Sequence, residues 1–261
     1  MNIDEIRTIE KEMVRILPIF LNEFIDFVSY ETRDYITSLL RQNRAFQLIG
    51  FDNGLGAWTD ERKIYFAIQN KNMFEKLAKK PEYGQNKGMK LVSNDNFVDN
   101  DKDYIDYMNY VVANGLSELD YCLDLLPHQV MHLIGCKGGI FGEGITELRT
   151  RQVCEKYGIR CAPVLHSKET KLIKLMEEFI DKMIINESGF WGDFCMLEEA
   201  LEKRFGEKEF KSIYEDLCID YRIYASDRSR DPFEHYNKYR EIDFSKIFEL
   251  IETKRDSKIE A

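Results

Sequence analysis

Two histidines spaced four residues apart are the first side chains in this sequence that could do chemistry. His128 and His132 lie in the segment Leu126–Gly135, which is otherwise largely apolar. On a helix, residues i and i+4 share a face, so both imidazoles can reach a single metal ion. Pro127 suits the first turn of such a helix and Gly135 suits its end. We therefore expect a metal-binding helix between these two residues.

A second polar pattern, Gly142-Glu143-Gly144-Ile145-Thr146-Glu147, follows His132 after a short gap. We expect a second helix to open at Gly142, with Glu143 bringing a carboxylate to the same ion. Glu147, one turn later, would orient a ligand histidine, and it is also an alternative third ligand. Two imidazoles, one carboxylate and a water favour Zn²⁺. The alternative is that these polar side chains bond to one another, or lie exposed, without any metal.

The two patterns together resemble the gluzincin branch of the zinc metallopeptidases, whose signature is HExxH followed by a glutamate on a later helix. The resemblance runs from Leu126 to about Arg151, and it implies zinc held by His128, His132 and Glu143. The sequence departs from the family at Gln129, where the family has its general base. Glutamine has nearly the shape of glutamate, but it cannot take a proton from a zinc-bound water.

The resemblance implies peptide-bond hydrolysis on a polypeptide substrate, with zinc polarising the scissile carbonyl and activating a water. With Gln129 at the base position, we expect the chain to bind substrate better than it cuts it. One hypothesis is a peptidase made inactive, or substrate-trapping, by this residue, and it predicts that Gln129→Glu raises turnover by several orders of magnitude. A second is a natural pseudo-peptidase that serves as a zinc-containing protein- or peptide-binding module. A third is a helical interaction module without metal.

The same resemblance implies a side chain that donates to the tetrahedral oxyanion, a role often filled by Tyr or His. The sequence does not rank the candidates, which are His166, Tyr157, Tyr221, Tyr224 and His235. Each of the two histidines of this set is more simply explained as a surface or capping residue.

Composition and charge narrow the class of protein. The 261 residues include 37 Lys and Arg against 47 Asp and Glu, for a net charge of −10. This balance argues against nucleic acid and membrane surfaces as partners, because both need a basic face, and it favours a polypeptide substrate or partner protein. The N-terminus lacks the apolar core of a secretory signal, and no apolar run approaches the ~18 residues of a membrane span. Six cysteines without CxxC spacing indicate reduced thiols in a cytoplasmic protein.

The remaining sequence predicts an α+β fold that is mostly α-helical with a small antiparallel sheet. The resemblance implies that this fold has a zincin-like core with an active-site helix. We expect a single metallopeptidase-like domain over 1–261. It would comprise N-terminal helices in 1–44, the sheet and metal-site core in 45–160, and C-terminal helices in 161–261. Pro18 interrupts the helical periodicity of 3–17 and 19–40, which predicts two helices or one kinked helix.

Alternating patterns predict strands at 45–51, 55–59 and 63–68, joined as an antiparallel meander. The resemblance implies that Gly54–Trp58 or Lys63–Ile68 is an edge strand that pairs with an extended substrate. The alternative is that these strands only cover the helices. Helices are expected at 72–79, 103–113 and 117–126, with a long lid or plain mobile loop at 81–101. Ser167 is a plausible helix cap, and further helices are expected at 170–186, 194–205, 207–221 and 244–254.

Overall fold

The computed structural model describes residues 1–52, 57–60, 62–67, 117–162, 166–226 and 241–256. Over these residues the chain is mostly helical with one small sheet, as the sequence predicted. The chain forms two compact units, one of Met1–Cys136 with Arg149–Ser167, and one of Lys137–Leu148 with Lys168–Ala261. The single domain over 1–261 stays a prediction, and the elements expected at 72–79, 81–101 and 103–113 lie outside the described residues.

Helix α1 (Ile3–Glu23) opens the first unit and continues through Pro18. Of the two predicted alternatives, that of two separate helices meeting at this proline is therefore wrong, and one helix that contains Pro18 is what the structure has. Asn2 and Glu5 form a capping box at its start, and an apolar stripe that includes Phe20 is buried. Proline frees the carbonyl four residues earlier, which belongs to Val14. Val14 is exposed, so water can satisfy that carbonyl and the helix continues. The chain breaks instead after Glu23, before α2 (Tyr30–Arg41).

The sheet of the first unit has three strands in the order β1-β3-β2. Residues 45–48 form a 3-10 turn, η1 (Ala45–Leu48), so the first strand, β1 (Ile49–Asp52), is shorter than predicted. It pairs in parallel with β3 (Ile64–Ala67), and β2 (Ala57–Thr59) pairs antiparallel with β3.

The predicted antiparallel meander is therefore wrong, because the third strand inserts between the first two and so lies parallel to β1. Lys63–Ile68 is also wrong as an edge, since β3 is the central strand. Strand β2 does lie at an edge, as predicted for Gly54–Trp58, although residues 53–56 lie outside the described residues.

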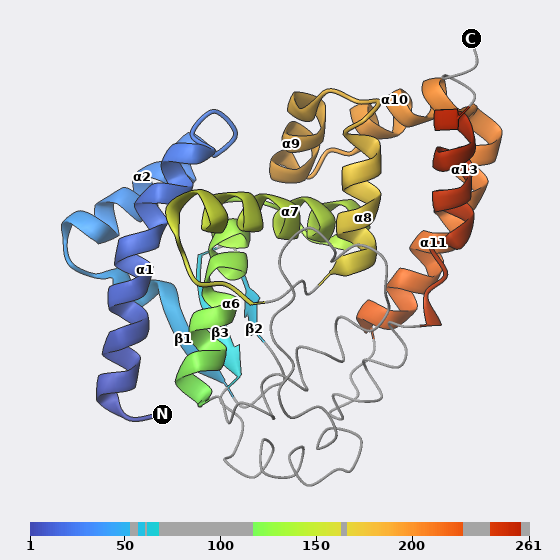
Figure 1. Ribbon diagram of the computed structural model, residues 1–261. Coiled ribbons are helices and arrows are strands. Elements are labelled where there is room, and N and C mark those ends of the chain that lie inside the picture. The colour runs from blue at the N-terminus through green and yellow to red at the C-terminus, as the bar shows by residue number, and fades with distance from the viewer. Residues whose placement is uncertain (53–56, 61, 68–116, 163–165, 227–240, 257–261) are drawn as a thin grey trace, which may run out of the picture. The chain divides into compact units, whose positions relative to one another are not determined.

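Helix α6 (Glu118–Leu133) carries both candidate histidines and is capped at its start by Ser117 and Asp120. Pro127 lies in the middle of this helix, so its predicted place in a first turn is wrong, and the two helices expected on either side of it are one. Gly135 follows the helix end with φ 129°, a conformation that favours glycine, as predicted. Helix α6 packs against α1 and against strands β2 and β3 (Figure 1).

Helix α7 (Gly139–Tyr157) starts three residues before the predicted Gly142. Its first half belongs to the second unit, with α8 (Ser167–Met176), α9 (Lys182–Trp191), α10 (Cys195–Phe205), α11 (Glu207–Ser226) and α13 (Ser245–Asp256). The single helix predicted over 170–186 is wrong. The helix ends at Met176, and Asp181 caps a new one by accepting a hydrogen bond from the Met183 N–H.

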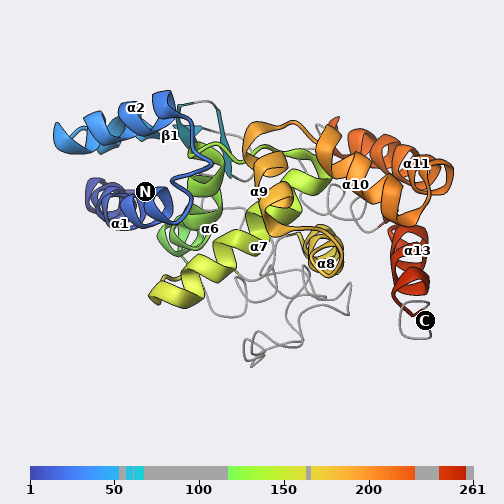
Figure 2. The same ribbon diagram turned by 90° about the horizontal axis from the view of Figure 1, so that it is seen from above.

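Aromatic rings hold the second unit together. Helices α10 and α11 run side by side (Figure 2), and Tyr214 stacks on Phe141 of α7 with ring centroids 4.8 Å apart. Phe210 also stacks on Tyr214, with ring centroids 5.7 Å apart, and the ring of Phe205 in α10 lies 6.5 Å from that of Phe210. Such rings bury large apolar areas, which fixes the helices that carry them. Among the described residues, no helix combines the length and apolar character needed to cross a membrane.

Candidate metal centre

The two histidines of α6 turn their outer nitrogens toward each other. The Nε2 atoms of His128 and His132 lie 3.1 Å apart, and the ring centroids 4.9 Å apart. Two nitrogens bound to one tetrahedral zinc at about 2.05 Å would be roughly 3.3 Å apart. The pair is thus already spaced as two ligands of one ion. His128 is buried and His132 half-buried, so the first ligand is shielded from water.

A backbone carbonyl fixes the orientation of His132. Its Nδ1 lies 2.9 Å from the carbonyl oxygen of Cys136, just past the end of α6. A carbonyl oxygen only accepts, so Nδ1 carries the ring proton and donates it, which leaves the lone pair of the neutral ring on Nε2. This is the tautomer that binds a metal through Nε2. The Cys136 N–H in turn donates to the carbonyl of Met131 at 3.1 Å, which holds the loop in place.

Glu143 completes a group of three possible ligands, as the sequence predicted. Ligand atoms of His128, His132 and Glu143 all lie within 4.8 Å of one another. Two imidazole nitrogens and one carboxylate oxygen are the donor set of many catalytic zinc sites, so these residues fit the ion. We refer to the three as the candidate metal centre. Glu147 is buried one turn further along α7, and its predicted part in orienting a histidine stays a prediction.

Close packing against neighbouring backbone explains why glycine stands on either side of Glu143. A Cβ on Gly144 would lie 2.5 Å from the carbonyl oxygen of Glu169 in α8, and one on Gly142 would lie 2.0 Å from the carbonyl oxygen of Lys137. Both distances are too short for any side chain. The Gly-Glu-Gly sequence therefore sets Glu143 on a stretch of α7 where the neighbouring backbone comes very close.

Gln129, at the position where the resembling family has its base, is hydrogen-bonded to the sheet. Its Oε1 accepts a hydrogen bond from the Thr59 hydroxyl at 2.8 Å, and its Nε2 donates to the carbonyl of Ala57 at 3.3 Å. Both partners belong to β2, and the Gln129 side chain is buried. An amide satisfies both partners at once, because it accepts and donates. A carboxylate would have no proton to offer the Ala57 carbonyl.

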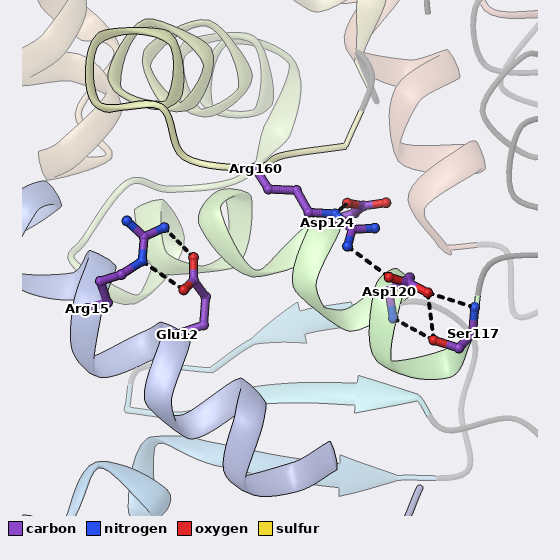
Figure 3. Close-up of polar contacts among 6 residues, drawn as sticks. All are labelled: Glu12, Arg15, Ser117, Asp120, Asp124 and Arg160. Carbon is purple, nitrogen blue, oxygen red and sulfur yellow. Dashed lines mark hydrogen bonds and ion pairs between the residues drawn. The ribbon is translucent and has the colours of Figure 1, made fainter. Parts of the chain in front are cut away.

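An arginine holds the segment after α7 against α6 (Figure 3). Arg160 donates to the carboxylates of Asp124 and Asp120, the latter at 2.8 Å, and the Ala162 N–H donates to the Asp124 carbonyl at 2.7 Å. Arg151 donates to the carbonyl of Ala162 at 3.0 Å. Asp124 lies one helical turn before His128 and on the same face, so these bonds hold Arg160 and Ala162 close to the helix that carries the histidines.

The three charged groups of this network titrate differently. The hydrogen bond from Arg160, followed by that from Ser117, lowers the pKa of Asp120. Burial raises the pKa of Asp124, although the bond from Arg160 works in the opposite direction. Burial by itself would lower the pKa of Arg160, but its hydrogen bonds to the two carboxylates raise it. Arg160 therefore stays charged and compensates the buried Asp124.

The candidates for an oxyanion donor are placed very differently. The ring of His166, just before α8, lies 5.5 Å from that of His128 between centroids. Tyr157 is well exposed at the end of α7 and donates its hydroxyl to Glu23 of α1. Tyr221 is buried on α11 in the second unit. The side chain of Tyr224 and all of His235 lie outside the described residues. Among these candidates, His166 alone has a ring contact with a candidate ligand in the described part of the chain.

Sequence reasoning missed the residues that support the site. Asp124 precedes His128 by four residues on the same helix, so helical spacing was a usable signal for it. Cys136 lies beyond the end of α6 and contacts His132 through its backbone carbonyl, for which the residue type gives no signal. Thr59 gave no such signal, because its contact with Gln129 joins residues 70 positions apart.

Comparisons with known proteins gave no relative. No family model matches the chain, and neither a curated protein nor a solved structure does. Function is therefore inferred from the residues of the candidate metal centre and their surroundings.

Proposed function

We propose that the chain is a zinc-binding protein of the metallopeptidase type that holds its ion through His128, His132 and Glu143, and binds a polypeptide without hydrolysing it. The observation that carries the metal assignment is the facing pair of Nε2 atoms, 3.1 Å apart. The Cys136 carbonyl supports it, since it selects the metal-binding tautomer of His132. A bound zinc would supply Lewis-acid polarisation of a carbonyl and activation of a water.

The state of Gln129 supports a binding role over hydrolysis. Removing a proton from a water needs a base within hydrogen-bond reach, and a glutamine amide is not a base. Moreover, the oxygen of this amide accepts a hydrogen bond from Thr59, and its nitrogen donates one to the Ala57 carbonyl of β2. The residue therefore has a structural role that glutamine fills and glutamate does not. This favours a natural pseudo-peptidase over a peptidase carrying a single inactivating change.

The class of partner follows from charge and setting. The net charge of −10 favours a neutral or cationic polypeptide, because an acidic protein repels nucleic acids and anionic membranes. None of the six cysteines forms a disulfide in the structure. Burial raises the pKa of the Cys122 thiol to about 12, which keeps it protonated and unreactive. These thiols support our proposal of a reducing, cytoplasmic setting.

Gln129→Glu tests the proposal against the peptidase hypothesis. Zinc-loaded protein of both forms is incubated with a mixed peptide library, and cleavage is followed by mass spectrometry. We expect zinc content to be retained and cleavage to stay at background in the variant. The double variant Gln129→Glu/His132→Ala is the control for metal-dependent activity. A gain of several orders of magnitude in turnover, absent from the double variant, would show that the scaffold is a peptidase and that our binding assignment is wrong.

A further inference from the structure

A third histidine lies beside the candidate metal centre without belonging to it. His166 is in the first unit together with His128 and His132. Its ring is nearly parallel to that of His128, with 23° between the planes and 5.5 Å between the centroids. We propose that His166 is a fourth protein ligand of the ion, so that the site is closed by three imidazoles and one carboxylate. This inference rests on the proposed zinc site at His128, His132 and Glu143.

The ring separations are those of imidazoles that share an ion. With a zinc–nitrogen bond of about 2.05 Å, the centre of each ring lies about 3.2 Å from the metal, and two rings at the tetrahedral angle have centres about 5.2 Å apart. The His128 and His132 rings are 4.9 Å apart, and the His128 and His166 rings 5.5 Å apart. Both values lie about 0.3 Å from that distance.

The chain just before His166 is fixed to the helix that carries the other two histidines. Arg160 and Ala162 are bonded to Asp124, which lies on the same face of α6 as His128 and one turn earlier. Only three residues separate Ala162 from His166. Contacts within the first unit therefore support the proximity of His166 to His128.

One adjustment completes the coordination. The ligand atoms that lie within 4.8 Å of one another come from His128, His132 and Glu143, so a nitrogen of His166 must approach them by rotation of its ring. The torsion about the Cβ–Cγ bond of histidine has a broad energy profile, so such a rotation costs little.

A fourth protein ligand changes what the site can do. Catalytic zinc sites keep one position open for water, whereas structural sites fill all four with protein ligands. With His166 bound, no position remains for a water that a base would activate. This agrees with the structural use of Gln129, because a closed site has no need of a base. The zinc would then stabilise the surface on which a polypeptide binds.

X-ray absorption spectroscopy at the zinc edge tests the proposal, because multiple scattering from imidazole rings counts the histidine ligands. Wild-type protein is compared with His166→Ala and with His235→Ala, which removes the one histidine outside the proposed set. We expect three imidazoles in the wild type and in His235→Ala, and two in His166→Ala. Zinc affinity, measured by competition with a chromogenic chelator, should fall about 10-fold or more in His166→Ala alone. Circular dichroism checks that each variant is folded.

The outcomes separate this inference from the function on which it rests. Two imidazoles in all three proteins, with equal zinc affinity, would overturn the role of His166 and leave an open three-ligand site. Absence of zinc from all three, after reconstitution with zinc alone, would overturn the proposed function as well. Cobalt substitution gives a second readout, since a closed tetrahedral site absorbs strongly in the visible range. The band should weaken in His166→Ala as water enters the coordination sphere.

Discussion

Neighbouring residues of α6 make different kinds of contact. His128 and His132 face each other across 3.1 Å, and a backbone carbonyl sets the tautomer of His132. Gln129, next in the chain to His128, is instead bonded to two residues of strand β2. One set of side chains is thus arranged for an ion, and the other is used to hold a helix against a sheet.

The difference shows that neighbouring positions of one helix can carry a candidate metal ligand and a purely structural hydrogen bond. In our proposal these are the metal-binding part and the base position of a peptidase-type site. Metal binding needs donor atoms at the right spacing, and these three ligands have it. Hydrolysis also needs a base free to accept a proton, and the amide of Gln129 lacks both the chemistry and the freedom. A sequence change at one position of a helix can therefore keep the metal while giving the neighbouring position a structural role.

The largest effect should come from removing the carboxylate ligand. Glu143→Gln keeps the shape of the side chain and removes its charge, and we expect zinc affinity to fall at least about 100-fold, beyond what outer partners of a ligand carry. Isothermal titration with zinc measures this. Glu147→Gln is the matched control, because Glu147 lies one turn later on the same helix and is the alternative ligand. A larger loss for Glu147→Gln than for Glu143→Gln would reverse the two assignments.

A smaller effect is expected from removing the hydrogen bond that Thr59 of β2 donates to Gln129. Thr59→Val keeps the volume of the side chain and removes the hydroxyl that donates to Gln129, which should lower the free energy of unfolding by about 1 kcal/mol. Urea denaturation followed by circular dichroism measures the change. Zinc affinity should stay at the wild-type value, because Thr59 contacts no ligand of the candidate metal centre. A joint loss of stability and zinc affinity would show that the two sides of α6 are coupled.

The smallest effect concerns the pH dependence of the Arg160 network. The pKa of Asp120 is lowered, so its ionised form stabilises the folded state above the ordinary carboxyl value of about 4, and this contribution is lost as the pH falls further. Asp120→Asn should therefore be less stable than the wild type at pH 7, by no more than about 1 kcal/mol, since the group is partly exposed. Urea titrations between pH 7 and pH 3 should show the difference shrinking. A difference that is constant over this range would contradict the assignment.

Asp124→Asn gives the opposite sign and serves as the comparison for this network. Because burial raises the pKa of Asp124, protonation favours the folded state. The wild type should therefore gain stability relative to the variant as the pH falls through the raised native pKa toward the ordinary carboxyl value of about 4, which urea titrations over the same pH range measure.

The local parts of the fold and site were predictable from sequence. The shared face of His128 and His132 and the stop at Gly135 follow from helix geometry, and the structure confirms both. Glu143 lies on the next helix, and the resemblance supplied its place as a third ligand; the structure groups its carboxylate with the two imidazoles. The two prolines misled the prediction for one reason. Proline is read as a helix break, yet Pro18 frees only a carbonyl that water can reach, and Pro127 is carried through by the tertiary packing of α6.

Non-local contacts could not be read from the sequence. Turn residues after β1 suggested a hairpin between consecutive strands, whereas the sheet has β1 paired in parallel with β3. Strand order is a tertiary property that the local turn pattern does not determine. The Gln129 contact depends on Thr59, and the position of His166 depends on Arg160 and Asp124. Each joins residues far apart in the chain, for which no local period gives a signal.

Zinc content tests the central claim most directly. Purified wild-type protein and His132→Ala are reconstituted with zinc, dialysed and measured by elemental mass spectrometry, with circular dichroism to confirm that both are folded. We predict about one zinc per wild-type chain and almost none in the variant, because His132 supplies a nitrogen preset for the ion. A wild-type chain without zinc, or equal zinc in both proteins, would contradict the metal site and with it the proposed function.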